Sequence, residues 1–375
     1  MEIGEWTCND QDQGMNRTLL QRKSPAGFIE SAKLYPLVSI IIPALNEELW
    51  IRRSIDSVLR QTWKHLEVIV VNDGSTDNTE AICRTYRNRI RYIRQEWRGV
   101  SAARNRGIFL SSGSLIGFLD ADDELFPDMV DHLVKQLLRF PQAGAASGAF
   151  VLEGDYAPIR KPGRGSIFAN GESSGIIHSF FDVLDKTIVC TGSMLVRREV
   201  LDQVGHFNEA LHVGEDMELW CRIGGNFPWV FSDREMMIYH KNESDSEKKR
   251  IRQGATWKWI LTKREMKKKI LSEHWVSYRQ YLERIYIKYS KNLLVKGETA
   301  RAREILGTIS PQVRNISWYM LSILALLPSF LVVLIVKSVI TLKKGYRLNN
   351  TKWVSEHVRK FCQLRRAHSP QMYED

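Results

Sequence analysis

The stretch LIGFLDADDE, residues 115–124, joins an apolar run to four acids within five residues. A short apolar run of this kind is typical of a buried strand. Because alternate residues of an extended chain point the same way, Asp120 and Asp122 can face one ion. Carboxylates this close repel one another unless a cation lies among them, and their oxygens suit Mg²⁺ or Mn²⁺. The alternative is a solvated acidic turn before a helix beginning near Pro127, which Asp123 would cap.

The sequence around this stretch alternates short apolar runs with segments of helical spacing. Strands are expected at residues 37–42, 66–71, 90–93 and 115–119, and helices at 47–62, 78–86, 100–110 and 127–139. Further strands are expected at 145–152, 187–196 and 229–239, and a helix at 215–223. This order predicts an α/β fold with a mostly parallel central sheet, whose ligands bind at the carboxyl ends of the strands. Asn46, Glu47 and Asp73 fall at such ends.

The composition is that of a folded protein with an uneven excess of basic residues. Of 375 residues, 43% are hydrophobic, and the formal net charge is +11. The basic clusters lie mainly in the later part of the chain and are interrupted by apolar residues, so no nucleic-acid partner is expected. The five cysteines are widely spaced without a Cys-x-x-Cys pair, so neither a zinc site nor a disulfide framework is expected.

Composition also divides the chain into segments. They are a polar lead-in (1–36), an α/β domain (37–244), a basic helical region (245–315), a hydrophobic membrane-associated segment (316–342) and a basic tail (343–375). The lead-in has no apolar run of the length that a signal peptide needs. Within the basic helical region, residues 286–309 are expected to form one helix-turn-helix unit with Gly297 at the turn.

The hydrophobic segment contains 21 uncharged residues, 316–336, with Pro328 near the middle. A single span is one interpretation, because this length can cross a bilayer. Two short helices kinked at Pro328 and dipping into one leaflet are another, and a buried helical hairpin in a soluble domain is the third. The positive-inside rule places the basic tail in the cytoplasm, so we expect attachment at the cytoplasmic face of the membrane.

Several motifs, in order along the chain, resemble glycosyltransferase family 2. They are VSIIIPALNEE (38–48), VVNDGSTD (70–77), GVSAARNRG (99–107), LDADD (119–123), VGHFNE (204–209) and GEDMELW (214–220). The fourth looks like the family's DxD-type motif and the last like its ED segment. The resemblance implies a GT-A fold, a nucleotide-sugar-binding domain. The chain departs from the family at Trp97, where Asn is frequent, and at His206, where Gly is usual.

The resemblance implies a donor site at the sheet edge. Asp73 would hold the nucleotide base, often uracil, which favours a UDP-sugar; helix capping is its alternative. Glu47 would be a second nucleotide contact, or an ordinary acid at a helix N-terminus. Pro43 and Asn46 belong to the same motif and are expected to line the donor site.

The sequence contains no phosphate-binding glycine loop of the dinucleotide-binding or P-loop kind. Other groups must therefore neutralise the negative charge of the donor diphosphate. Arg104 would neutralise a phosphate or pair with Asp120. The resemblance implies that Asp122 coordinates Mn²⁺ or Mg²⁺ and that Asp120 contacts ribose or serves as a second ligand. His240 would complete the metal shell, or have only a structural role.

Asp216 is the candidate general base, since an acceptor hydroxyl must lose its proton as it attacks. Glu215 beside it is the alternative. The expected function is inverting sugar transfer, of the hexosyltransferase type, to a glycan or lipid-linked acceptor in cell-surface polysaccharide or glycolipid synthesis. Two rivals are a catalytically silent GT-A-like module that binds glycan or a partner, and a nucleotidyltransferase, whose usual glycine-rich opening is absent.

Overall fold

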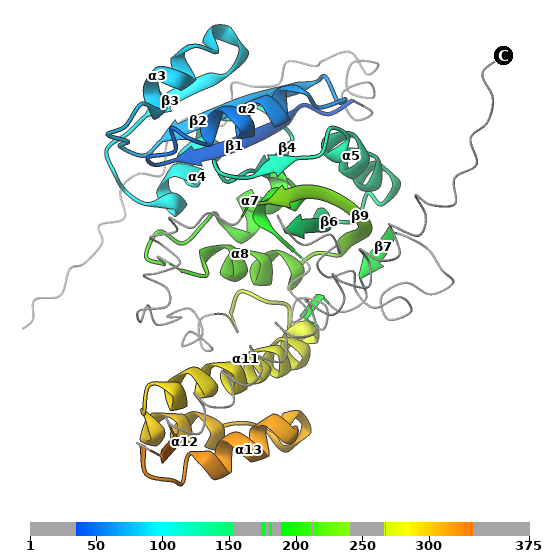
Figure 1. The fold of residues 1–375 in the computed structure, drawn as a ribbon. Helices are drawn as coiled ribbons and strands as arrows, with labels where there is room; N and C mark the ends of the chain where they lie inside the picture. Colours follow the sequence, from blue (N-terminus) through cyan, green and yellow to red (C-terminus); the bar gives the residue numbers. More distant parts are fainter. Residues whose placement is uncertain are drawn as a thin grey trace, which may run out of the picture.

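The computed structural model describes residues 35–152, 174–177, 180–181, 189–211, 213–240, 266, 268–329 and 331–332. The expected lead-in up to residue 34, the end of the expected α/β domain at 241–244 and the start of the basic region at 245–265 lie outside these described residues. The hydrophobic segment beyond residue 332 and the basic tail also lie outside them. Within them, one sheet is flanked by helices, and three later helices lie together at one end of the molecule (Figure 1).

The first half of the sheet forms as the sequence predicts. Its strands are parallel, stand in the order β3-β2-β1-β4, and comprise β1 (Val38–Ala44), β2 (Leu66–Asn72), β3 (Arg91–Arg94) and β4 (Leu115–Phe118). The helices of this half are α2 (Ile51–Leu59), α3 (Thr79–Arg84), α4 (Val100–Leu110) and α5 (Met129–Arg139). Ile40 and Ile42 pack in one core cluster and Ile41 in another, so β1 is buried on both faces. This burial explains its unbroken apolar run.

The second half corrects the expectation of a mostly parallel sheet. Its strands are β5 (Glu124–Leu125), β6 (Ala145–Leu152), β7 (Ser174–Ile177), β8 (Met194–Arg197) and β9 (Trp229–Tyr239). Only β6 and β9 are parallel; β4–β8, β6–β8, β5–β9 and β7–β9 are antiparallel. Parallel neighbours need a crossover, usually a helix, and the regular strand-helix alternation stops after α5. The GT-A-like α/β fold therefore contains a mixed sheet.

Two helix starts lie later than expected. The helix expected from residue 47 begins at Ile51, after a turn in which Asn46 has a φ of +57°. The helix expected from residue 127 begins at Met129, so Asp123 is too far away to cap it. The expected capping role of Asp123 is wrong: its Oδ1 accepts the backbone N–H of His240 at 3.0 Å and ties the acid cluster to the end of β9.

Two helices lie between β8 and β9 along the chain. They are α7 (Arg198–Val204) and α8 (Glu215–Gly224), and the turn Thr191–Ser193 leads into β8. Helix α8 packs beneath the sheet through Trp220, whose ring meets that of Trp229 on β9 edge to face at 6.2 Å. The stretch VGHFNE (204–209) begins at the last residue of α7 and continues into the loop before α8.

The C-terminal helices continue the core. They are α11 (Trp275–Val295), α12 (Thr299–Gly307) and α13 (Ile316–Leu324), with short turns at Ser272–His274 and Pro311–Val313. Tyr278 and Tyr281 on α11 pack against Phe181, with ring centroids 5.1 and 6.0 Å apart. Gly297, with a φ of +79°, forms the turn between α11 and α12, as expected.

The apolar run from residue 316 does not form one continuous helix, and the break begins four residues before Pro328. Helix α13 ends at Leu324, and the backbone N–H of Val332 bonds to the carbonyl of Pro328, so a new helical turn starts at the proline. In the part of the chain that the structure describes, no helix is both long enough and apolar enough to cross a membrane.

Candidate active site

The sequence-predicted donor residues gather at the carboxyl edge of β1 and β2. Asn46 ties the two strand ends together: its N–H donates to Ser75 Oγ at 2.9 Å and its Oδ1 accepts the Thr76 N–H at 2.8 Å. The Glu47 N–H donates to Thr79 Oγ1 at 2.8 Å, where α3 begins. Pro43 is buried in β1. These residues therefore shape the edge of the sheet at which the donor is expected to bind.

The carboxylate of Asp73 binds the segment at residues 95–99, which lies next to this edge. Its Oδ1 accepts bonds from Gln95 Nε2 at 2.7 Å and the Arg98 N–H at 2.9 Å, and its Oδ2 accepts the Gly99 N–H at 2.7 Å. Asp77, not Asp73, accepts the N–H of Thr79 at the start of α3. Asp73 therefore does not cap α3, but it does bind the backbone N–H of Gly99, the N-cap residue of α4. These bonds leave fewer of its acceptor positions for a nucleotide base.

A hollow of about 480 Å³ lies beside Asp73, lined by Gly74, Arg94, Gln95, Glu96 and Trp97. A Cβ on Gly74 would come within 2.9 Å of the Trp97 backbone nitrogen, so glycine permits the close crossing of the two segments. Trp97, the departure from the family pattern, is 61% exposed at this hollow. An exposed aromatic ring there offers a stacking surface.

Arg104 on α4 joins two motifs that lie far apart in the sequence. Its Nη2 donates to Asp120 Oδ1 at 2.7 Å and its Nη1 donates to Glu215 Oε1 at 2.9 Å. The Arg104 side chain is 4% exposed. Burial alone lowers the pKa of Arg104, but Asp120 and Glu215 more than offset this and raise it. The guanidinium is therefore a permanent charge between the DxD-like motif and the ED-like segment, as the pairing alternative predicted.

Asp216 stands beside this pair in the first turn of α8. Its Oδ1 accepts the Met217 N–H at 2.7 Å, and the side chain is half-buried. Burial, and then the charge of Glu215, raise the pKa of Asp216 to about 6. Glu215 is hydrogen-bonded to Arg104. The raised pKa of Asp216 suits proton transfer near neutral pH.

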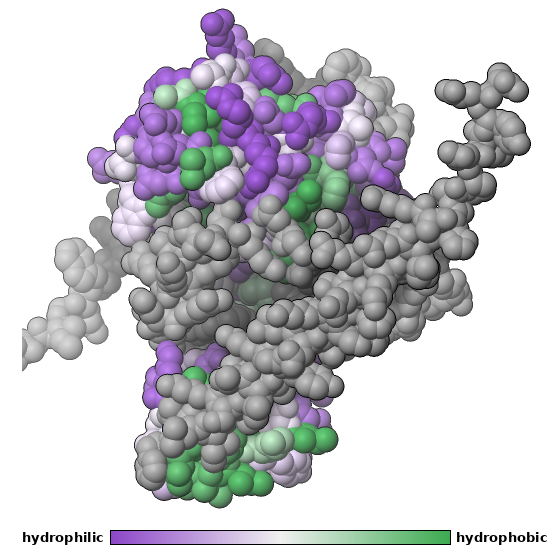
Figure 2. Space-filling view, in the orientation of Figure 1, coloured by the Kyte–Doolittle hydropathy of each residue, from purple (hydrophilic) through white to green (hydrophobic). Residues whose placement is uncertain are grey.

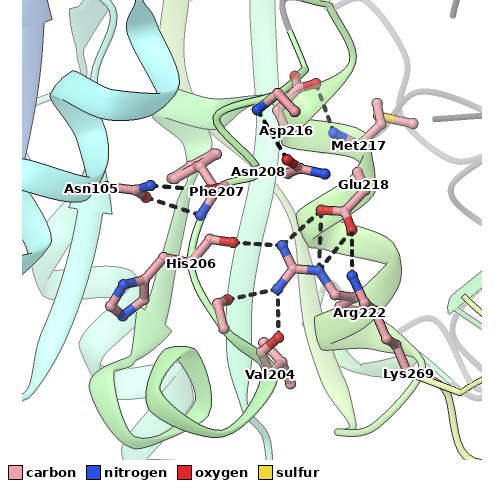
Figure 3. A network of polar contacts seen from close by, with 12 residues as sticks. Asn105, Val204, His206, Phe207, Asn208, Asp216, Met217, Glu218, Arg222 and Lys269 are labelled. Atoms are coloured by element: carbon pink, nitrogen blue, oxygen red, sulfur yellow. Dashed lines mark hydrogen bonds and ion pairs between the residues drawn. The ribbon is translucent and has the colours of Figure 1, made fainter. Parts of the chain in front are cut away.

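The loop that leads to α8 is fixed by a network that the sequence analysis missed (Figure 3). Arg222 Nη1 donates to the carbonyls of Val204 and Gly205 at 2.6 and 2.7 Å, and Nη2 donates to the carbonyl of His206 at 2.6 Å. Its Nε and Nη2 also bond to Glu218, at distances from 2.7 to 3.1 Å. The i,i+4 spacing of Glu218 and Arg222 was the signal that could have found this pair.

The same loop is bound to α4 as well. Asn105 accepts the Phe207 N–H and donates to the Phe207 carbonyl, both at 3.0 Å, and the Arg104 guanidinium lies 5.2 Å from the Phe207 ring. The loop is thus attached to α4, whose Arg104 binds Asp120, and to α8, which contains Asp216. The position of Asp216 relative to the sheet edge depends on both attachments.

The expected metal residues are placed differently from the prediction. The structure does not bring Asp120, Asp122 and His240 together as a three-ligand site: among the residues it describes, no group of three or more His, Cys, Asp or Glu side chains is arranged to hold a metal. His240 is buried, and its backbone is held by Asp123. One or two carboxylates still fit a Mg²⁺ or Mn²⁺ that takes its remaining ligands from water and substrate phosphates.

Comparison with known proteins shows a family match over the first part of the chain. Residues 39–205 match the family model described as Glycosyl transferase family 2. Over 222 residues the chain is 32% identical to an uncharacterized glycosyltransferase of Rickettsia felis, covering 58% of this chain and 36% of that protein. Over 148 residues it is 41% identical to the hyaluronan synthase of Pasteurella multocida, covering 36% of this chain and 15% of the synthase. The match thus spans about a third or less of these relatives.

A solved structure extends the likeness in fold. The S. aureus protein TarS, residues 1–349, in complex with UDP-GlcNAc, superimposes with a TM-score of 0.59, covering 83% of this chain and 92% of that one at 17% identity. At this identity the likeness concerns the fold alone. Residues 39–205 thus match glycosyl transferase family 2, within a chain of GT-A-like fold.

Proposed function

We propose that the protein transfers a sugar from a nucleotide-diphosphate sugar to an acceptor hydroxyl with inversion. The observation that carries the proposal is the buried Arg104, which holds the acid of the DxD-like motif, Asp120, next to the Glu215–Asp216 pair at the carboxyl edge of a GT-A-like sheet. TarS, which shares the fold, has been solved with UDP and with UDP-GlcNAc, which supports a UDP-sugar as donor.

In this mechanism each residue has one task. Asp73 and the rim made by Asn46 and Glu47 position the nucleotide at the strand ends. Asp216 takes the proton of the acceptor hydroxyl as its oxygen attacks the anomeric carbon from the side opposite the leaving diphosphate. A Mg²⁺ or Mn²⁺ bound by Asp122 and the diphosphate would offset the negative charge on the leaving group.

The acceptor that we propose is a glycan or lipid-linked glycan at the cytoplasmic face of the membrane, in cell-surface polysaccharide or glycolipid synthesis. The uncharged run at 316–336 and the basic residues that follow it support this location. The similarity of the domain to a hyaluronan synthase, which builds a polysaccharide, supports an acceptor of this kind.

The test is a screen of nucleotide sugars for thermal stabilisation and for Mn²⁺- or Mg²⁺-dependent hydrolysis. We expect Asp122→Ala to lose the metal-dependent part of donor binding, and Asp216→Asn to keep donor binding but lose transfer by about 10²–10⁴-fold. Asp202→Asn, an exposed carboxylate on α7, is the matched control and should behave as wild type. Full transfer by Asp216→Asn would remove the assigned base, and no response to any donor would favour the silent binding module.

A further inference from the structure

In the part of the chain that the structure describes, helix α13 has one exposed side. Ile316, Tyr319, Met320 and Ile323 are 80%, 57%, 60% and 64% exposed, and their spacing of three to four residues places them on one face, which we call the α13 face. Leu326, just beyond the helix, is 70% exposed. Apolar side chains gather at the end of the molecule formed by α12 and α13 (Figure 2). Soluble monomers rarely expose a contiguous apolar patch unless it binds something.

The opposite side of α13 is firmly packed. Leu321 and Ala325 are buried in the core cluster that includes α11. Trp318 Nε1 donates to the carbonyl of Leu306 on α12 at 2.9 Å, and Asn315 Oδ1 accepts the Trp318 N–H at 3.0 Å as the N-cap. The α13 face is therefore presented by an anchored helix and does not result from a helix that has failed to dock.

The charge of the surrounding sequence indicates what kind of surface the α13 face meets. Between residues 305 and 355 the sequence holds six basic residues and no acid. One of them, Arg314, stacks on Trp318 at 4.4 Å from the ring centroid, directly beside the start of α13. A positive segment is attracted to anionic lipid headgroups, whereas a second copy of the same segment would be repelled.

The length of α13 determines how it can meet a bilayer. Nine residues of helix measure about 14 Å, roughly half of the hydrocarbon thickness. A helix of this length with aromatic residues at its start, an apolar face and basic flanks lies in the plane of the interface.

We propose that the α13 face binds to the surface of an anionic lipid bilayer, with α13 lying in the interfacial plane. The proposal rests on the membrane location that we propose above, and it identifies the part of the protein surface that contacts the membrane. It does not depend on the assignment of catalytic residues.

The test uses the full chain and co-sedimentation with vesicles of phosphatidylcholine, with and without phosphatidylglycerol. We expect binding to the anionic vesicles, loss of most of it at high salt, and a decrease of about tenfold or more in Met320→Glu/Ile323→Glu. Phe109→Glu, at an 82% exposed apolar position on α4, is the matched control and should bind vesicles as wild type.

Two further measurements separate the possible failures. Melting temperature and its shift with UDP-sugar should be the same in wild type and both variants, which shows that fold and donor site are intact. Equal vesicle binding by wild type and the double variant would overturn the proposal. A concentration-dependent dimer in sedimentation equilibrium, abolished by the double variant and without vesicle binding, would assign the α13 face to a second copy instead.

Discussion

At the scale of single residues, Arg104 is the charge on which the site depends. Replacing it by Met leaves the buried Glu215 and the partly buried Asp120 without their common partner. We expect Arg104→Met to lower the free energy of unfolding by about 3–5 kcal/mol, measured by urea denaturation. Arg106→Met, at an exposed position on the same helix, should change it by less than about 0.5 kcal/mol. Similar losses in both variants would contradict this role for Arg104.

The acidity of Asp216 gives a second prediction at this scale. A base must be deprotonated, so kcat/KM should decrease about tenfold per pH unit as the pH falls below about 6, the raised pKa of Asp216. Glu215→Gln removes one cause of that raised pKa, so the acidic limb of the pH–rate profile should move to lower pH. A limb that stays in place in Glu215→Gln would show that another group titrates.

At the scale of elements, the loop at 204–208 is positioned by α8 through Arg222. The Arg222 side chain is 4% exposed, so its hydrogen bonds are buried. We therefore expect Arg222→Met to lower the free energy of unfolding by about 3–5 kcal/mol. It should also lower kcat more than it weakens UDP-sugar binding, because the loop leads to Asp216 and not to the donor rim.

A matched pair on another helix provides the control for this prediction. Arg84 and Glu80 also form an i,i+4 pair, but Arg84 is 66% exposed. Arg84→Met should therefore change the free energy of unfolding far less than Arg222→Met does, and leave kcat unchanged. If Arg222→Met were equally mild, the loop would be held by its contacts with α4 instead.

At the scale of the whole molecule, the C-terminal helices share the core of the sheet domain. Tyr278, Tyr281 and Leu282 of α11 are buried in the cluster that contains Phe181 and Trp220. A chain ending at residue 244 would expose this surface, so we expect it to aggregate and to bind a hydrophobic dye. A chain ending at residue 332 keeps the three helices and should melt cooperatively. Cooperative melting of the shorter chain would show an independent domain.

The sequence by itself determined the first half of the sheet and the positions of the motif acids. Val38 to Ile42 and Leu115 to Leu119 are short, mainly apolar runs typical of buried strands, and a parallel sheet places the residues after them at one edge. This information is local, since it depends on periodicity and on residues adjacent in the chain. Strand 145–152 and helix α8 were predicted for the same reason.

Only the tertiary structure decided the direction of the later strands and the partners of the buried charges. Nothing local distinguishes a parallel from an antiparallel β8, and the pairing of Arg104 with Glu215 joins residues 111 positions apart. The burial that raises the pKa of Asp216, the bond from His240 to Asp123 and the exposure of the α13 face all arise from packing between distant segments. Such properties depend on the surroundings of a side chain, which the sequence specifies only through the completed fold.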